Sequence, residues 1–163
     1  MADAEEIVIR QARPDDFEAI ASVTAEVFRP FALEAHIQEA IGNAGGQEWL
    51  RIKTAEIERD RRADPEGCFV AERGGRVVGY LTSALSPFVS RGRIVDLAVA
   101  AECQGRGVGR RLIETALARF RRLGLKQAKI ETLTCNPVGR HLYPAVGFKE
   151  IARQIHYIVP LEP

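Results

Sequence analysis

The sequence is poor in the residues that build covalent or metal-held scaffolds. Its 163 residues include only three cysteines and three histidines. Cys68, Cys103 and Cys135 are odd in number and form no C-x-x-C pair, and the histidines show no helical pairing or carboxylate cluster at ligand spacing. We therefore expect no disulfide framework, no metal site and a reducing, cytoplasmic environment.

Long apolar runs and charge of one sign are also missing. No stretch approaches the roughly 18 consecutive apolar residues of a membrane span, and the chain starts with an acidic segment. We therefore expect a soluble protein with no membrane segment and no cleaved leader. With 23 Lys+Arg against 22 Asp+Glu, the formal net charge is +1, which gives no general attraction to nucleic acid or anionic membrane. A phosphate-bearing ligand would have to be held locally.

The chain does contain enough apolar residues for one sizeable core. Hydrophobic residues make up 46% and charged residues 28%, which excludes a disordered tail protein. We find no repeat, linker or low-complexity run, so residues 1–163 are expected to form a single domain.

Patterning in the first third of the chain predicts mainly helices. The apolar run 7–9 predicts a short strand, and apolar residues at three- and four-residue steps after Pro14 predict a helix that stops near Pro30. Two more helices are expected between residues 31 and 62, joined by a glycine-containing turn at 42–46.

Strand signals dominate from residue 68 onward. The runs 68–71 and 77–81 flank Gly74-Gly75 as in a β-hairpin, and 93–99 continues the sheet. An amphipathic helix and a strand at 128–134 then form a crossover, which places its two strands parallel.

Asn136-Pro137 is typical of a helix start, and Gly147 of a helix stop. Residues 148–151 and 154–161 are expected to be the last two strands. The sequence therefore predicts a mixed α/β fold, with a mostly antiparallel sheet of about seven strands flanked by helices.

The most informative stretch is a glycine-rich turn between a strand and an amphipathic helix, Gln104-Gly105-Arg106-Gly107-Val108-Gly109-Arg110. Alternate glycines let successive N–H groups point into one concave site at the positive end of the helix, which suits a pyrophosphate. A plain tight turn is the alternative. A dinucleotide fingerprint needs a small residue where Arg110 stands, and a P-loop needs Lys and Ser/Thr, so NAD, ATP and GTP are disfavoured.

Read as Q-x-x-G-x-G, this turn matches the acetyl-CoA pyrophosphate signature of the GNAT-type N-acetyltransferases. Asp96-Leu97-Ala98-Val99 resembles the fourth strand of that family. Asn136, with Leu142-Tyr143 and Gly147-Phe148, resembles its second cofactor-binding motif. The resemblance covers residues 93 to 148 and implies acetyl-CoA as co-substrate and a splayed pair of parallel strands.

The resemblance also implies which residues bind the cofactor. Backbone groups of Leu97 and Val99 would pair with the pantetheine arm, and an N–H near Leu97 or Ala98 would stabilise the oxyanion. Arg106 or Arg111 could reach a phosphate. The implied cofactor-binding residues are Leu97, Ala98, Val99, Gln104, Gly105, Arg106, Gly107, Val108, Gly109, Arg110, Asn136 and Tyr143.

Two residues are candidate catalytic groups. Tyr143 matches the family tyrosine that protonates the departing thiolate, and a half-buried helix tyrosine without a catalytic role is the alternative. Pro144, directly after it, departs from the usual polar residue and could distort the helix. Asp96 could serve as general base, directly or through water, or could simply form a salt bridge. Where some members carry a glutamate base, this chain has Arg93.

Other residues are weaker candidates for the site. His156 and Tyr157 on the last expected strand would lie near the acceptor end. Arg119, Arg121 and Arg122 at the end of the amphipathic helix are interpreted as a solvated face rather than a nucleic-acid site, because the charge is balanced and no aromatics are interleaved.

The resemblance implies transfer of an acetyl group from acetyl-CoA to a primary amine by direct attack in a ternary complex. Because a carboxylate is missing at position 93, a non-catalytic acyl-CoA-binding or sensing module is the alternative. The amine acceptor, a small molecule, peptide N-terminus or lysine, has no signature, and neither does the segment 30–62. The resemblance also allows a homodimer.

Overall fold

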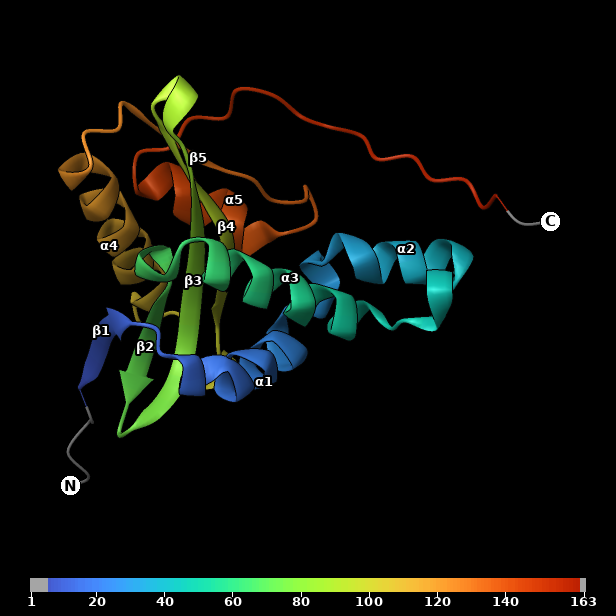
Figure 1. Ribbon diagram of the computed structural model, residues 1–163, viewed down its shortest axis with the longest axis horizontal. Helices are drawn as coiled ribbons and strands as arrows, with labels where there is room; N and C mark the ends of the chain where they lie inside the picture. The colour runs from blue at the N-terminus through green and yellow to red at the C-terminus, as the bar shows by residue number, and fades with distance from the viewer. Residues whose placement is uncertain (1–5, 162–163) are drawn as a thin grey trace.

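A computed structural model describes residues 6–161 and shows one open mixed sheet flanked by helices (Figure 1). The sheet order is β1-β2-β3-β4-β5; the first four strands pair antiparallel and β4 pairs parallel with β5. The strands are β1 (Ile7–Gln11), β2 (Phe69–Arg73), β3 (Arg76–Ser86), β4 (Arg91–Val99) and β5 (Gln127–Ile130). The acidic start of the chain, up to residue 5, lies outside the described residues.

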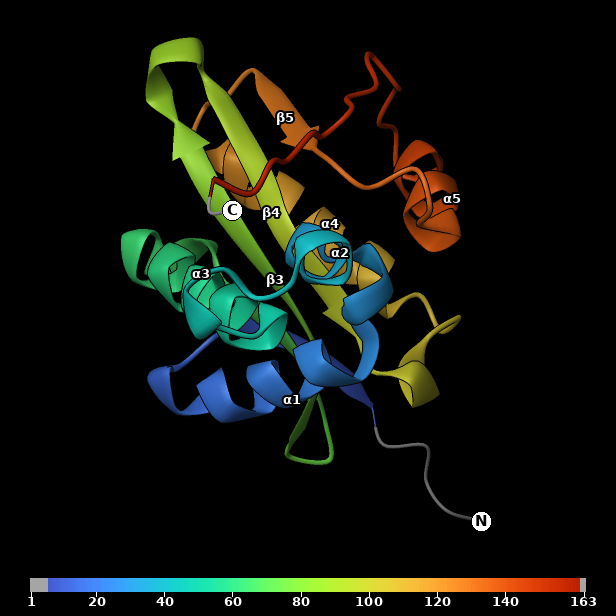
Figure 2. The same cartoon turned by 90° about the vertical axis from the view of Figure 1, so that its right-hand side faces the viewer.

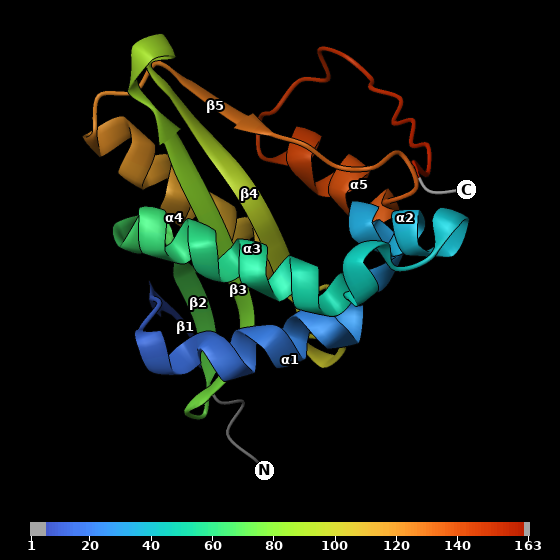
Figure 3. The same ribbon diagram turned by 45° about the vertical axis from the view of Figure 1, so that its right-hand side comes forward.

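Helices cover both faces of the sheet (Figures 2 and 3). The helices are α1 (Phe17–Val27), α2 (Leu33–Ile41), α3 (Trp49–Ala63), α4 (Val108–Arg122) and α5 (Pro137–Ala145). Helices α1 and α3 pack on one face, where the hydroxyls of Thr24 and Tyr80 hydrogen-bond at 2.8 Å. Helix α4 packs on the other face, where Phe120 lies so close to Gly92 that a Cβ there would meet its ring at 2.6 Å. Gly92 therefore sets how closely α4 approaches β4.

The core lies between these layers and is continuous across the sheet. Its least exposed side chains come from the central strands and from α4, where apolar residues recur at helical spacing. They include Val70, Val78, Leu81, Ile94, Leu112 and Ile113, each no more than 1% exposed. This packing holds β4, which carries much of the predicted site, between two helical layers.

Most predicted elements are confirmed. Helix α1 ends at Val27, before Pro30, and two helices follow in the segment that matched no motif. Gly74 and Gly75 both have positive φ and close the β2–β3 hairpin, as their lack of a Cβ allows. The crossover from β4 through α4 to β5 gives the one parallel pair of the described sheet.

The predicted strand count is wrong, because the sheet has five strands rather than seven. β5 ends at Ile130 instead of residue 134, and residues 148–161 form no strand. The chain after α5 runs outward as an extended segment (Figure 1). Ile151, Tyr157 and Leu161 are 87%, 89% and 93% exposed. An apolar β pattern specifies a strand only where a partner edge meets it, and this segment meets none within the described residues.

The predicted solvated face of α4 is wrong at Arg119. Its side chain is 4% exposed and forms a bidentate pair with Asp64, at 2.9 and 2.7 Å. Arg121 and Arg122 remain exposed. The helical pattern could not show this, because Asp64 follows α3 and lies 55 residues away in sequence.

Candidate functional site

The parallel strands β4 and β5 separate part of the way along their length. They pair from Arg91↔Gln127 to Ile94↔Ile130, and in Figures 2 and 3 they then diverge. On its other edge β4 stays paired with β3 as far as Val99. Residues 95–99 therefore present a backbone edge without a partner strand among the described residues. The register shifts at Val95, because Ile94 pairs with Ser83 and Asp96 with Thr82.

The glycine-rich loop follows the free end of β4 directly and leads into α4. Gly105 and Gly107 have φ of 71° and 77°, a region that a residue with a Cβ adopts only with strain. The first helical hydrogen bond runs from the Arg111 N–H to the Gly107 carbonyl, at 3.0 Å. The N–H groups before it have no carbonyl one turn earlier, so they face outward at the positive end of α4.

Two contacts hold this loop in place. Gln104 donates from Nε2 to the Val99 carbonyl at 2.9 Å, which ties the loop to the end of β4. Val108 is 2% exposed and anchors the first turn of α4 in the core. The loop is therefore fixed on both sides while its tip, including Arg106, stays exposed.

The arginines after the loop point in different directions. Arg110 donates to the Ala145 carbonyl at 3.2 Å and so contacts the end of α5. Arg111 donates to the Ile7 carbonyl at 2.7 Å and thereby ties α4 to β1. Arg106 and Arg111 are the two candidates for a phosphate contact. Because Arg111 is engaged with β1 and Arg106 is exposed at the loop tip, Arg106 is the better placed.

Helix α5 packs against the start of α4. A Cβ on Gly109 would lie 3.1 Å from Leu142 Cδ2, so a larger residue there would push the two helices apart. Asn136 caps α5, because its Oδ1 accepts from the Gly139 N–H at 3.1 Å. Its Nδ2 donates to Thr132 Oγ1 at 2.9 Å, so both ends of this amide are engaged.

Tyr143 is half-buried on α5 near Phe148, with ring centroids 6.4 Å apart in an edge-on arrangement. Burial raises the pKa of its phenol to about 12, opposed by a hydrogen bond with Thr132. Pro144 does not end the helix, which continues to Ala145. The N–H groups of Val146 and Phe148 both donate to the Tyr143 carbonyl, at 3.2 and 3.0 Å. The turn after Tyr143 is therefore closed despite the proline.

Asp96 lies on β4 where the two strands part and is 2% exposed. Its Oδ2 accepts a hydrogen bond from Thr82 Oγ1 at 2.9 Å, and its Oδ1 is 2.5 Å from Lys53 Nζ. Lys53 comes from α3 and also lies 5.1 Å above the Phe28 ring. The carboxylate proposed as a base is thus engaged in an ion pair.

Lys53 is the main residue that sequence reasoning missed. It stands four residues after Trp49 and four before Ile57, both buried, so it shares their face of α3. A lysine within an apolar helical stripe is the signal that could have indicated a buried partner.

Other candidates are not brought to this site. Arg93 points to Glu131, at 2.7 Å, and both side chains are nearly half exposed. His156 and Tyr157 lie on the extended C-terminal segment and are exposed. The structure therefore gathers β4, the glycine loop and α5, but not the last predicted strand.

The three cysteines differ in exposure. Cys68 and Cys103 are buried, and burial raises the pKa of the Cys68 thiol to about 12. Cys135 is exposed, just before the cap of α5. A buried thiol is out of reach of a substrate, so neither Cys68 nor Cys103 suits a covalent intermediate.

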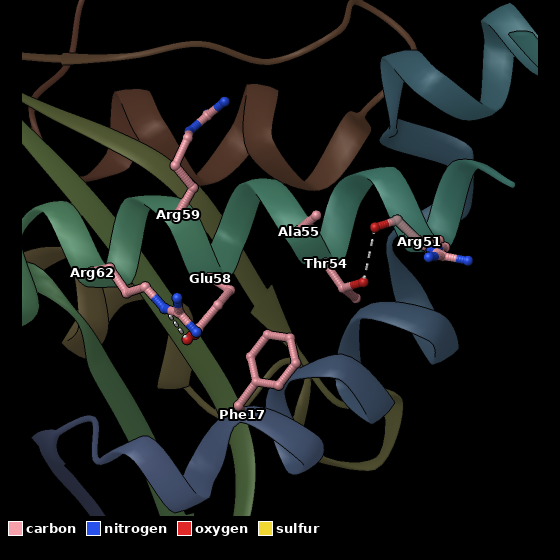
Figure 4. A pocket seen from close by; sticks show the side chains of 7 residues that line it. All are labelled: Phe17, Arg51, Thr54, Ala55, Glu58, Arg59 and Arg62. Atoms are coloured by element: carbon pink, nitrogen blue, oxygen red, sulfur yellow. Dashed lines mark hydrogen bonds and ion pairs between the residues drawn. The ribbon is translucent and has the colours of Figure 1, made fainter. Parts of the chain in front are cut away.

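A hollow of about 500 Å³ lies elsewhere, between α1 and α3 (Figure 4). Glu58 in this hollow accepts hydrogen bonds from Arg61 and Arg62, which hold the pKa of its carboxyl near 2, with Arg61 the larger cause. The hollow contains none of the predicted site residues. It is lined by Phe17, Arg51, Thr54, Ala55, Glu58, Arg59 and Arg62.

The described part of the chain offers neither a metal-binding cluster nor a membrane-spanning helix. Between residues 6 and 161, no three His, Cys, Asp or Glu side chains gather as a group able to hold a metal ion. In the same range no helix is both long enough and apolar enough to cross a membrane.

Solved structures share this fold. PH1933 from Pyrococcus horikoshii superposes with a TM-score of 0.72 at 22% identity, over 91% of this chain and 92% of that one. The PaiA N-acetyltransferase from Thermoplasma acidophilum, solved in complex with coenzyme A, superposes with a TM-score of 0.69 at 18% identity, over 88% of this chain and 90% of that one.

Relatives found by sequence are also acetyltransferases, and the match extends over more than half of the chain. A mycothiol acetyltransferase from Propionibacterium freudenreichii is 30% identical over 117 residues, which are 68% of this chain but only 37% of that protein. The chain thus spans less than half of that relative. Residues 30–148 match the acetyltransferase (GNAT) family, and the matched region contains the free β4 edge, the glycine loop and α5. The chain therefore belongs to the GNAT acetyltransferase family.

Proposed function

We propose that this protein transfers the acetyl group of acetyl-CoA to a primary amine by direct attack in a ternary complex. One observation carries the proposal: an edge of β4 that has no partner strand between residues 6 and 161 leads straight into a glycine loop at the N-terminus of α4. The first offers backbone groups to an amide-containing arm, and the second offers N–H groups to a pyrophosphate.

In this arrangement the cofactor would lie along β4 and across the start of α4. The backbone of Leu97 to Val99 would pair with the pantetheine arm, and an N–H near Leu97 or Ala98 would stabilise the oxyanion formed on the thioester carbonyl. Gly105 to Arg110 would hold the pyrophosphate, with Gln104 fixing the loop through Val99.

Acetyl transfer also needs a proton donor and a proton acceptor. A tyrosine phenol is protonated at neutral pH even at its ordinary pKa, and burial raises the pKa of Tyr143 further, so it would donate its proton to the departing CoA thiolate. Asp96 would accept the proton that an acceptor ammonium must lose. For that role the acceptor would have to share or replace the ion pair with Lys53.

The named relatives are acetyltransferases that differ in their acceptor. Several are mycothiol acetyltransferases, and another is an N-alpha-acetyltransferase from Sulfurisphaera tokodaii, 28% identical over 55% of this chain. These names share an acetyl transfer reaction but differ in acceptor. We therefore assign a primary amine to this chain and no particular molecule.

An acyl-CoA sensing module is the second candidate, and a specific observation favours it. Arg93 stands where a carboxylate would be expected and pairs with Glu131, while the nearby Asp96 is already paired. Such a module would bind the cofactor but would not transfer acetyl groups.

Thermal unfolding with acetyl-CoA, desulfo-CoA, NAD and ATP tests cofactor binding. A ligand at about 100 times its Kd adds roughly 2.7 kcal/mol to the free energy of unfolding, a Tm rise of about 5–11 °C at this size. We expect this rise with the two CoA compounds alone. An equal rise with NAD or ATP, or none with CoA, would refute the cofactor assignment.

A panel of primary amines then separates the two candidates. Thiol release from acetyl-CoA that depends on the amine supports the transferase. Binding without amine-dependent release across small amines, peptide N-termini and lysine peptides supports the sensing module.

A further inference from the structure

Lys53 is enclosed to an unusual degree for a lysine. Its side chain is 14% exposed, against 41% for Lys129, and Lys126 and Lys149 are exposed. These are the four lysines of the chain. In a simple chemical reaction with an acetyl donor, the enclosed amine should therefore react most slowly.

The surroundings of Lys53 give it what an acetyl acceptor needs. Its Nζ is 2.5 Å from Asp96 Oδ1, and this carboxylate can take a proton from the ammonium. Asp96 directly precedes Leu97 and Ala98, the free part of β4 on which the thioester is proposed to lie. A primary amine, a proton acceptor and the donor strand thus meet at one place.

We propose that Lys53 is a self-acetylation site, at which acetyl-CoA bound along β4 acetylates the enzyme's own side chain. This inference rests on the proposed function, because it needs acetyl-CoA at that site. The ammonium of Lys53 gives one proton to Asp96, from which it passes to solvent. Nζ then attacks the thioester carbon, the N–C bond forms and the C–S bond breaks. As the C–S bond breaks, the nitrogen gives its second proton to Asp96, which has already released the first, and this proton also passes to solvent. The CoA thiolate takes a proton from Tyr143, which regains one from solvent, so one proton is released overall.

Acetylation would change the site itself. The acetylated nitrogen is neutral, so Asp96 loses its ion pair and keeps the hydrogen bond from Thr82. The carboxylate then becomes free for the ammonium of an external acceptor. Self-acetylation would therefore free Asp96 to accept a proton from an external amine. Before acetylation, the ion pair with Lys53 blocks this role.

Peptide mass spectrometry of the full chain incubated with isotope-labelled acetyl-CoA tests this inference. We expect Lys53 to be labelled at least about tenfold faster than Lys126 and Lys149, because positioning outweighs exposure. The rate should not depend on protein concentration, as a reaction within one molecule requires. In urea, where all four lysines are exposed, the preference should disappear.

Variants check the chemistry. Lys53→Arg keeps the positive charge and should abolish the fast label, while Lys149→Arg is the matched control and should retain it. Asp96→Asn should slow labelling of Lys53 at least about tenfold without changing that of Lys126. If the Asp96→Asn variant does not fold, a second measurement takes its place. The pH dependence of the labelling rate is then compared between Lys53 and Lys126 in the native protein.

The inference and the proposed function fail in different ways. If acetyl-CoA raises the Tm but Lys53 is labelled no faster than Lys126 and Lys149, self-acetylation is refuted and cofactor binding stands. If acetyl-CoA does not raise the Tm, the proposed function itself is refuted.

Discussion

At the scale of single residues, Tyr143 carries the proposed proton donation. Its phenol has a pKa of about 12 because it is buried, so it stays protonated across the pH range in which enzymes work. Its carbonyl accepts two hydrogen bonds that close the turn after Pro144, which fixes the backbone under the ring. The backbone is thus held independently of the hydroxyl.

Replacing Tyr143 with Phe should therefore lower turnover by about 100-fold, the usual contribution of a general acid. The Kd for acetyl-CoA should stay within about twofold, because the ring and its contact with Phe148 remain. Thiol release with an amine that the native protein accepts measures the first quantity, and calorimetric titration the second. Unchanged turnover would rule out the acid role.

Residue roles set by local sequence could be predicted, but those set by distant partners could not. Asn136 caps α5 as its position before Pro137 indicates. Asp96 and Arg119 carry charges whose partners, Lys53 and Asp64, lie 43 and 55 residues away in sequence. A local pattern can indicate that a charged residue such as Lys53 lies on a buried helix face, but it does not show which distant residue becomes its partner until the helices are placed on the sheet.

At the scale of elements, the loop before α4 depends on backbone shape more than on side chains. Gly107 has φ of 77°, and no heavy atom lies within 4 Å of the position that a Cβ would take. Gly45, between α2 and α3, has φ of 64° and is equally open at that position. Both positions strain any other residue to a similar extent. Only Gly107 lies at the proposed pyrophosphate site.

Gly107→Ala and Gly45→Ala should each lower the free energy of unfolding by about 1 kcal/mol, the cost of left-handed backbone with a Cβ. Only Gly107→Ala should weaken acetyl-CoA binding, by about tenfold, since it disturbs the N–H groups at the start of α4. Chemical denaturation and calorimetric titration of both variants check this. Equal cofactor affinity in the two variants would contradict the assignment of the loop.

Elements that are bounded by glycines at a turn or a helix end could be predicted from the sequence. The β2–β3 hairpin has Gly74-Gly75, and α4 lies between the glycine loop and Gly124. The segments 148–151 and 154–161 were expected to be strands, but they have no partner strand among the described residues, and apolar residues alone cannot supply one.

At the scale of the whole molecule, the C-terminal segment adds little buried surface. Its large apolar side chains are largely exposed, from 49% for Ile158 to 93% for Leu161. The sheet and both helical layers are complete without it (Figure 1). Stability should therefore reside in the part of the chain up to Phe148.

Removing residues 152–163 should change the Tm by no more than about 2 °C, because exposed residues seldom contribute more than about 0.5 kcal/mol. The Tm rise with acetyl-CoA should also remain. Differential scanning fluorimetry of the shortened and full chains, each with and without acetyl-CoA, measures both. A fall of about 5 °C or more would mean that these residues pair with the sheet, as the sequence pattern predicted.

The unequal exposure of the cysteines gives this protein a natural attachment point for a reporter. Cys68 and Cys103 are enclosed, so a thiol-reactive dye added to the folded chain should couple at Cys135 alone. Cys135 directly precedes the cap of α5, and its Sγ lies 3.6 Å from the carbonyl of Pro30, which precedes α2. A fluorophore there would sit between α5, which packs against the proposed cofactor site, and the segment that leads into α2, and its emission could follow ligand binding before any acceptor is identified.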